Sequence, residues 1–579
     1  MAEATPRRRW ALLAAWSVGV VALAALYGPA LVRHAGRSLD PLVYNDDVRV
    51  LIFPFFHYSD PELFAHDAIS DYYLAGLPEG YRILYYVAAK LSLAVALSKL
   101  LPYLLLAATV ALLGLAARHV AGGVAGSVAG FGAAALTLGS ALFLARMGGG
   151  LPRAFAYPLL AAAAAALALG KPRWLAGVVW FGAAFYPVVA VIAGLALALL
   201  LVLGPGDRGD AADWSLRRRA AFCGVTAAVA VVLILPAALR LRVWGRQLTP
   251  AAVAEYPEVG PGGRFFAEDR APFPGFLESA RRVARRAVMG AGERVLPAAA
   301  AWPRRGDGGR RRETALELLL VVAGLGSVRL AVARPEARRM LLLAAAAFAG
   351  HLAAGAVVPH LFLPQRYVQY PVPILAILLA ATGFAGLAPH DTRRAGSIRA
   401  ALVVAGNLGL IVVFGGRGSD EAGLTIAVSP DEAQVLRAIA ALPKRAVVAG
   451  WPAGTLDDVP YVARRAVLLS FETHLPYHEG YTRLARKRMS ALIDAYFATS
   501  PEPLLRLRDE FGVTDLLVDL DHLRRSPPGY FRPFDGEIRA ALRRAEGRPF
   551  EVERQARVAT AYAHGNSVLL DLSRLAPAP

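Results

Sequence analysis

Two clusters of acidic side chains near the N-terminus have the residue types and spacing for proton transfer. Asp46 and Asp47 are adjacent, and Asp67 and Asp71 follow about twenty residues later. Because neighbouring carboxylates repel each other, one member of a close pair can have a raised pKa in a dry site, which suits a general base. We predict that Asp46 and Asp47 are catalytic and that Arg49, Asp67 and Asp71 contact a substrate. The alternative is a solvated acidic loop whose acids are helix N-caps.

Arginines that could hold an anionic substrate follow two predicted turns. The segment 148–152, Gly-Gly-Gly-Leu-Pro, is a tight turn that would place Arg153 at the membrane surface. Arg366 and Tyr367 begin a later apolar run, and His360 lies close before them. An arginine can hold a phosphate through paired charged hydrogen bonds, so we predict substrate contacts for all four residues. The alternatives are a simple hairpin at the first turn and, at the second, a snorkelling arginine beside an interfacial tyrosine.

A third group of candidates lies in the C-terminal region. His474 and His478 are four residues apart, but Pro476 interrupts the regular helical face that would carry both. A zinc site would need a further ligand. We therefore predict no metal site here and keep two interpretations, substrate contact and structural loop residues. A divalent metal cofactor is possible, but no ligand set in the sequence demands one, and the single cysteine, Cys223, cannot form a disulfide within the chain.

These residues must be positioned by an unusually apolar chain. Mean hydropathy is +0.44 over 579 residues, and 18% of residues are charged against about 25% in soluble proteins. The apolar residues lie in long runs, which predicts a polytopic α-helical membrane protein and excludes a string of soluble domains, a disordered chain and a disulfide-built secreted protein. About eleven spans are expected: 10–32, 100–118, 121–145, 154–170, 173–185, 187–204, 219–240, 314–333, 339–358, 371–388 and 399–415.

The first apolar run and the segment 173–204 each allow two interpretations. The first run could be a signal peptide, but its length and the later spans favour an uncleaved anchor. The segment 173–204 is divided at Tyr186-Pro187, because proline removes a helical hydrogen bond. An apolar stretch after residue 82 carries Lys90 and Lys99 and predicts a helix lying at the interface.

The distribution of charge predicts the topology. With eleven spans and a cytoplasmic N-terminus, the basic turns lie in the cytoplasm, as the positive-inside rule requires: Lys171/Arg173, Arg217–Arg219, Arg334/Arg338/Arg339 and Arg393/Arg394. The loop 33–82, with eight acids and four arginines, then lies outside. The loop 242–313 is also external despite its formal charge of +6, which conflicts with the rule. Its arginines at 281, 282, 285 and 286 predict an amphipathic helix against anionic lipid.

The C-terminal region changes character and predicts a separate α/β domain. Apolar strand-like runs at 446–450, 466–470, 515–519 and 567–572 alternate with helical patterns near 430–442, 480–498, 501–511 and 535–546. We therefore divide the chain into a transmembrane domain, 1–416, with external loops 33–99 and 241–313, and an extracytoplasmic α/β domain, 417–579. The chain has a formal charge of +19, but this domain contributes only +1, which argues against a nucleic-acid partner.

The combination resembles the GT-C class of integral-membrane glycosyltransferases, which use polyprenyl-phosphate-linked sugars. The architecture carries most of the resemblance, and three short segments add to it: Asn45–Asp47, Pro152–Pro158 and Leu363–Tyr367. The resemblance implies a catalytic base at Asp46 or Asp47, with possible assistance from Asp67 or Asp71. It also implies that Arg366 holds the lipid phosphate, with Arg153 as a further candidate. Other motifs common among relatives of established activity are not recognisable in this chain.

The expected function is inverting transfer of a sugar from a polyprenyl-phosphate donor to an extracytoplasmic glycan, lipid or protein, at the inner membrane of a bacterium. One alternative is a transporter or flippase of a lipid-linked or anionic solute; another is a non-catalytic scaffold of the same fold. Transporters often contain inverted repeats with broken helices, and the break at Pro187 has no matching half. Charges concentrated in external loops, rather than within spans, favour chemistry at the membrane surface.

Overall fold

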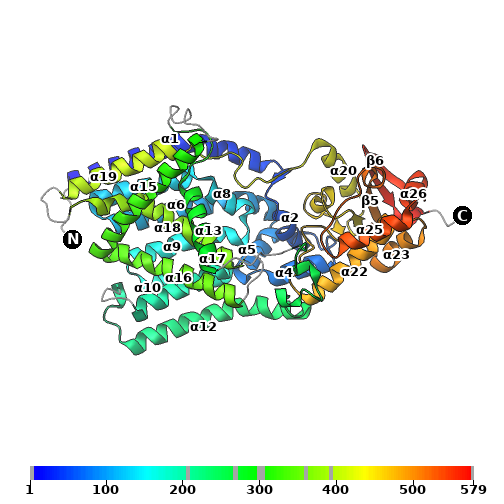
Figure 1. The fold of residues 1–579 in the computed structure, drawn as a ribbon, viewed down its shortest axis with the longest axis horizontal. Coiled ribbons are helices and arrows are strands. Elements are labelled where there is room, and N and C mark those ends of the chain that lie inside the picture. The colour runs from blue at the N-terminus through cyan, green and yellow to red at the C-terminus, as the bar shows by residue number, and fades with distance from the viewer. Residues whose placement is uncertain are drawn as a thin grey trace.

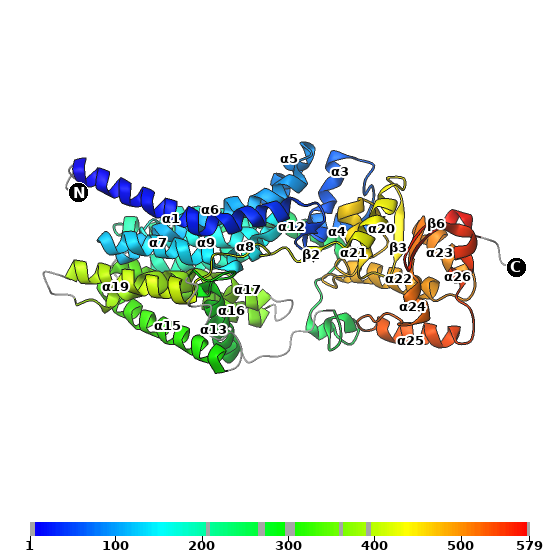
Figure 2. The same ribbon diagram turned by 90° about the horizontal axis from the view of Figure 1, so that it is seen from above.

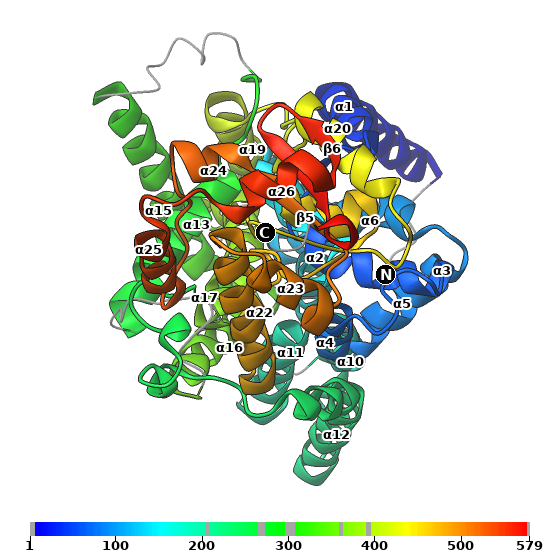
Figure 3. The ribbon, with the colours of Figure 1, turned by 90° about the vertical axis from the view of Figure 1, so that its right-hand side faces the viewer.

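The computed structural model describes residues 6–203, 209–264, 272–295, 307–357, 363–389 and 395–575. A long helical bundle carries an α/β domain at one end, and the N-terminus lies at the other end (Figures 1 and 2). Viewed from the side of the α/β domain, the sheet and its helices lie in front of the bundle, and α12 projects at the edge (Figure 3). The predicted fold class, a polytopic helical membrane protein with a C-terminal α/β domain, is confirmed.

Helices occupy all eleven predicted apolar segments. They are α1 (Pro6–Leu39), α6 (Ala94–Ala121), α7 (Gly123–Gly139) with α8 (Ala141–Met147), α9 (Ala156–Ala168), α10 (Pro172–Phe185), α11 (Pro187–Ala198), α12 (Leu216–Leu241), α15 (Asp307–Ala333), α16 (Pro335–Val357), α18 (Pro371–Thr382) and α19 (Ala395–Gly409). Helix α10 ends just before the predicted break at Tyr186-Pro187. Among the described residues, seven helices are long and apolar enough to cross a membrane, or eight if the bent α7–α8 pair counts as one span. The count of eleven spans stays a prediction.

The basic turns gather at the end of the bundle away from the α/β domain. Arg334 donates to the carbonyl oxygens of His119 and Ala121, so the turn after α15 meets the turn after α6. Arg339 donates to the carbonyl oxygen of Leu167 in the same way, and Lys171 pairs with Asp210. Arg393 and Arg394 lie outside the described residues. This grouping agrees with the predicted sidedness, while the side of the membrane that each end faces stays a prediction.

The first loop is a compact set of short helices rather than an extended segment. It contains β1 (Val43–Tyr44), α2 (Val48–Leu51), α3 (Phe56–Ser59), α4 (Ala68–Gly76) and α5 (Glu79–Lys90). The prediction of one interfacial helix carrying both Lys90 and Lys99 is wrong. Lys90 ends α5, whereas Lys99 lies within α6 and its Nζ donates to the carbonyl oxygens of Ser38 and Asp40. Carbonyl groups at the end of α1 thus satisfy its buried charge.

The α/β domain is built on a five-stranded sheet of order β4-β3-β5-β7-β6. Strand β3 (Val447–Gly450) is parallel to β4 (Ala466–Val467) and β5 (Asp515–Asp519), and β7 (Ser567–Asp571) is antiparallel to β5 and to β6 (Thr560–His564). The predicted strands are present, and so are the helices α20 (Pro430–Ala440), α22 (Glu479–Tyr496), α23 (Glu502–Phe511) and α25 (Phe534–Ala545). The edge strand β6 and the preceding helix α26 (Glu551–Ala559) were not predicted; the apolar run of β6 is only three residues long, 561–563.

The long loop after α12 contacts both parts of the molecule. Its first section lies on the α/β domain, where the amide of Leu248 donates to the carbonyl oxygen of Tyr477. Its helix, α13 (Pro272–Val288), packs on α8, α18 and the short α17 (Leu363–Gln369). The predicted helix is present, and its contact with anionic lipid stays a prediction. Two of its four arginines pair with acids of α15, Arg281 with Glu317 and Arg285 with Glu313.

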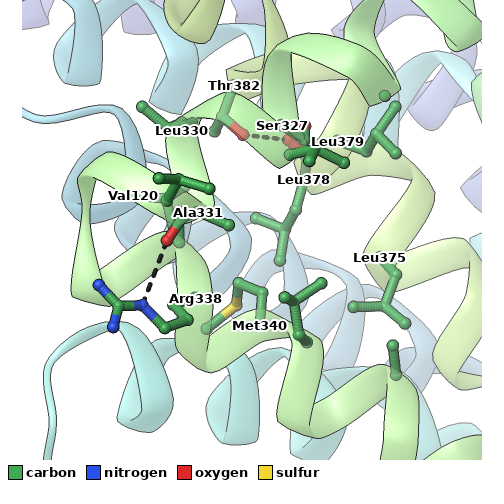
Figure 4. Close-up of a pocket in the computed structure, with 16 residues that line it drawn as sticks. Val120, Ser327, Leu330, Ala331, Arg338, Met340, Leu375, Leu378, Leu379 and Thr382 are labelled. Atoms are coloured by element: carbon green, nitrogen blue, oxygen red, sulfur yellow. Dashed lines mark hydrogen bonds between the residues drawn. The ribbon is translucent and has the colours of Figure 1, made fainter. Parts of the chain in front are cut away.

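An apolar cavity of about 720 Å³ opens between α15, α16 and α18 (Figure 4). Two of its three polar side chains are engaged with the backbone: the hydroxyl of Thr382 donates to the carbonyl oxygen of Leu378, and Nε of Arg338 donates to that of Ala331. The third is Ser327, whose buried hydroxyl has no hydrogen-bond partner among the described residues. The cavity therefore presents mainly hydrocarbon, and no predicted catalytic or substrate-binding residue lines it.

Candidate active site

Asp46 and Asp47 lie next to the turn between α8 and α9. Gly149 and Gly150 have φ values of 77° and 60°, which residues other than glycine rarely adopt. A Cβ atom at Gly149 would lie 2.6 Å from Cγ1 of Val48, and one at Gly148 would lie 3.0 Å from the carbonyl oxygen of Gly423. The glycines therefore allow the first loop to approach the turn closely, and Arg153 follows this turn in the chain.

The two adjacent aspartates have different surroundings. Asp47 forms an ion pair with Arg153, whose Nη2 also donates to Oδ1 of Asn45 at 3.0 Å. Within the described part of the chain, the side chain of Asp46 has no ion pair; its Oδ1 accepts a hydrogen bond from the amide of Asp47 at 3.0 Å. Its own amide donates to the hydroxyl of Thr425 at 2.9 Å, which fixes the backbone. Asp46 is half-buried and keeps acceptor capacity, while Asp47 is committed to Arg153.

Arg366 lies close to this ion pair although it comes from a distant part of the chain. Its Nη1 donates to the hydroxyl of Tyr186 at 2.7 Å. The ring of Tyr186 lies 5.3 Å from that of Tyr370, edge to face. Arg153 interacts electrostatically with Asp46, Arg366 and both tyrosines. Two arginines and two carboxylates thus meet at the end of the bundle that carries the α/β domain.

Tyr477 extends this cluster into the α/β domain. It interacts electrostatically with Arg366, with Arg264 and with Glu472, and burial raises the pKa of its phenol. Arg264 donates to Glu472 at 3.4 Å, and its guanidinium lies 3.6 Å from the centre of the Phe471 ring. The α/β domain therefore supplies one wall of the cluster.

Arg49 connects the first loop to the α/β domain. Its side chain is buried; Nη1 donates to Asp458 at 3.2 Å, and Nη2 lies 3.7 Å from Glu472. The hydroxyl of Tyr44 donates to the same Asp458 oxygen at 2.7 Å. Burial raises the pKa of Asp458, against the opposing charge of Arg49. This geometry favours a positioning role for Arg49 over the predicted substrate contact.

Asp67 and Asp71 lie at the start of α4, and their positions favour the alternative interpretation, that these acids cap or begin a helix. Asp67 is the N-cap of α4, where its carboxylate accepts hydrogen bonds from the amides of Ile69 and Ser70. Burial raises the pKa of Asp67 to about 6. Asp71 lies in the first turn of the same helix and is exposed. A capping aspartate stabilises a helix by satisfying its free amides, so Asp67 has a structural role whatever else it does.

The two histidines of the α/β domain are separated by their surroundings. His474 is fully buried among Phe531, Phe534 and Tyr530, and its Nδ1 lies 3.1 Å from the Tyr530 hydroxyl. Burial lowers the pKa of His474 to about 3, so the ring stays neutral. His478 precedes α22, and its Nδ1 lies 2.9 Å from the hydroxyl of Tyr72. These contacts favour the structural interpretation.

Tyr367 and His360 are the remaining residues predicted to contact a substrate. Tyr367 is buried on α17, where its ring fills the space above Gly350. His360 lies outside the described residues. Across the segments that the structure describes, no three histidine, cysteine, aspartate or glutamate side chains are close enough to hold a metal ion.

Several residues of the cluster were not predicted from the sequence, namely Tyr186, Tyr370, Tyr477 and Glu472. Tyr186 had a signal, because it occupies the break before Pro187 where a side chain can leave the helical pattern. Tyr477 lies between the two predicted histidines, His474 and His478, but was itself not predicted. Glu472 follows a strand by a few residues, and only the tertiary structure brings it to Arg49 and Arg264.

No protein-family model and no curated protein matches the sequence. Among solved structures, the chain is similar to ArnT from Cupriavidus metallidurans in the apo state, with 13% identity, coverage of 97% of this chain and 100% of that chain, and a TM-score of 0.48. For ArnT bound to undecaprenyl phosphate the identity is 15%, the match covers 96% of this chain and 99% of that chain, and the TM-score is 0.38. For the Archaeoglobus fulgidus oligosaccharyltransferase in complex with zinc and sulfate the identity is 12%, the match covers 93% of this chain and 73% of that chain, and the TM-score is 0.44. Because these TM-scores are below 0.5, the chemistry has to be inferred from the side chains of this chain.

Proposed function

We propose that this protein transfers a sugar from a polyprenyl-phosphate donor to an acceptor hydroxyl or amide of a glycan, lipid or protein, with inversion at the anomeric carbon. One observation carries the proposal: Asp46 and Asp47 share a site with Arg153 and Arg366, although four separate segments of the chain supply the cluster around them. A general base and fixed cations are the two components that such a transfer needs. The GT-C resemblance of the sequence supports the same reaction class.

The different surroundings of the two aspartates support different roles. Asp46 would accept the proton of the acceptor as the acceptor oxygen or nitrogen forms its bond to the anomeric carbon. The bond between that carbon and the phosphate oxygen breaks, and the electron pair leaves with the lipid phosphate. Asp47, already paired with Arg153, would position this arginine rather than accept the proton.

The arginines would stabilise the charge that gathers on the departing phosphate. Arg366 is held by the Tyr186 hydroxyl at one Nη atom, which leaves its other donors for a ligand. Fixed donors aimed at a developing negative charge contribute strongly to catalysis, because they need little rearrangement during the reaction. The half-buried position of both guanidinium groups would strengthen this effect.

The test compares four variants of the full chain reconstituted in lipid. The protein is given a polyprenyl-phosphate sugar and a panel of acceptors, and formation of the glycosidic bond is measured. For Asp46→Asn we expect kcat to fall by about 10² or more, the range typical for loss of a general base. For Asp47→Asn we expect a smaller loss that is not additive with Arg153→Gln, because the pair acts as one unit.

Asp60→Asn is the matched control, since Asp60 lies in the same loop but pairs with Lys444 at 2.8 Å. Its turnover should equal that of the unmodified protein. Unchanged turnover in Asp46→Asn would refute the proposed base. Movement of the lipid-linked sugar across the bilayer without bond formation would instead favour a flippase.

A further inference from the structure

A second group of arginines surrounds a small cavity on another side of α17. The cavity has a volume of about 130 Å³, and its polar lining consists of Arg146 from α8, Ser279, Arg282 and Arg286 from α13, and Gln365 and Gln369 from α17. We call it the arginine pocket. In water, about 30 Å³ is one molecule's share of the volume, so the pocket has room for about four waters or for one tetrahedral phosphate group.

The arginines of the arginine pocket are only partly balanced by acids. No acidic side chain lines it. Within the described residues, neither Arg146 nor Arg286 has an ion pair, and Arg282 pairs only with the exposed Glu278 at 2.6 Å. Like charges that converge repel each other, and an anion between them removes this cost. The neighbouring Arg281 and Arg285 point elsewhere and are paired with acids of α15.

The apolar side chains of the pocket indicate where its ligand comes from. Leu142, Val283 and Val368 complete the lining, so hydrocarbon and guanidinium groups lie side by side. Helix α17 belongs to the segment Pro364–Leu387, which is long and apolar enough to cross a membrane. Figures 1 and 2 show α8, α13 and α17 together in the helical bundle. An anion reaching this place from the bilayer would bring an apolar tail with it.

We infer that the arginine pocket binds a phosphate group carried by a membrane lipid. Arginine forks match phosphate oxygens in pairs, and the amides of Gln365 and Gln369 can donate further hydrogen bonds. The lipid can be an anionic phospholipid or a polyprenyl phosphate, because both present the same group. The site stands apart from the proposed sugar transfer: its residues differ from Asp46, Asp47, Arg153 and Arg366, although α17 contributes to both places.

The test measures lipid binding to the purified full chain by native mass spectrometry. The probes are phosphatidylglycerol, undecaprenyl phosphate, inorganic phosphate and, as a lipid without phosphate, diacylglycerol. We expect Arg146→Gln and Arg286→Gln each to weaken binding of at least one phosphate lipid by about ten-fold, the effect of losing a charged hydrogen bond. The lipid that responds identifies the source. Diacylglycerol binding should not change.

Arg281→Gln is the matched control, because it removes an equal charge from the same helix outside the pocket. If Arg146→Gln and Arg286→Gln bind every probe as Arg281→Gln does, the inference is wrong. A response of inorganic phosphate alone would also overturn it. Should the arginine variants fail to fold, Ser279→Glu supplies a second test, since a carboxylate in the lining of the pocket should repel the phosphate to a similar degree. Unchanged lipid binding in a folded Ser279→Glu variant would count against the pocket.

Discussion

At the scale of single residues, burial and pairing decide what each acid can do. Asp46 and Asp47 are identical and adjacent, yet of the two only Asp47 forms an ion pair within the described residues. Asp457 is a third case. It is buried in the α/β domain, where its Oδ1 accepts a hydrogen bond from the amide of Glu472 at 2.9 Å. Burial raises the pKa of Asp457 to about 7, while Arg49 nearby opposes the shift.

This shift predicts how stability depends on pH. The pKa of Asp457 is raised on folding, so the folded protein holds a proton that the unfolded chain has lost between about pH 4 and 7. The stability from this proton is complete below pH 4 and is lost as the pH rises through 7. In Asp457→Asn the apparent Tm should therefore vary less between pH 4 and 8. The exposed Asp213→Asn is the control, and an unchanged pH profile in Asp457→Asn would contradict the shift.

At the scale of elements, the glycine turn between α8 and α9 determines whether Arg153 can meet the acid pair. Gly149 has a left-handed backbone and touches Val48 of α2 with no room for a side chain. The turn therefore joins the first loop to the bundle in addition to reversing the chain. The predicted hairpin and the predicted substrate-binding arginine are parts of one structure.

Gly149→Ala should weaken both stability and transfer. A left-handed residue with a side chain costs about 1–2 kcal/mol, and the added Cβ would also push Val48 away from the turn. We expect a lower apparent Tm and a loss of turnover as Arg153 separates from Asp47. Gly177→Ala is the control, because no atom lies near its Cβ position on α10. Equal behaviour of the two variants would show that the close approach does not matter.

At the scale of the whole molecule, contacts between distant segments hold the α/β domain to the bundle. Strand β1 of the first loop pairs with β2 (Ile426–Ala427), near the start of the domain. Arg49 and Tyr44 both contact Asp458 across this junction. Since the cluster around Asp46 includes Tyr477 of the domain, loosening the junction should also disturb the site.

Arg49→Met should destabilise the junction strongly. Removing one partner of a buried ion pair leaves an uncompensated charge and typically costs about 3–5 kcal/mol. We expect faster proteolysis between the bundle and the domain, and partial recovery in the double variant Arg49→Met/Asp458→Asn, which removes both charges. Arg33→Met is the control, because its pair with Asp420 is exposed and contributes at most about 1 kcal/mol. No difference between the two single variants would exclude this role of Arg49.

Local patterns in the sequence were sufficient for most of the helices and strands. The apolar runs and the proline at 187 located the helical segments, because helix length and the loss of a backbone donor act within a few residues. The alternation of strands and helices after residue 416 predicted the sheet for the same reason. Strand β6 was missed, since an edge strand needs no apolar run.

The tertiary structure decided the roles of the charged residues. Whether an arginine faces a ligand, a lipid or an acid depends on partners that are distant in the sequence: Arg49 meets Asp458, Arg366 meets Tyr186, and Arg281 meets Glu317 on a neighbouring helix. The sequence by itself determined that acids and arginines would stand at the ends of apolar helices. Only folding brought Asp46, Arg153 and Arg366 to one place, because electrostatic pairing acts through space and leaves no periodic trace along the chain.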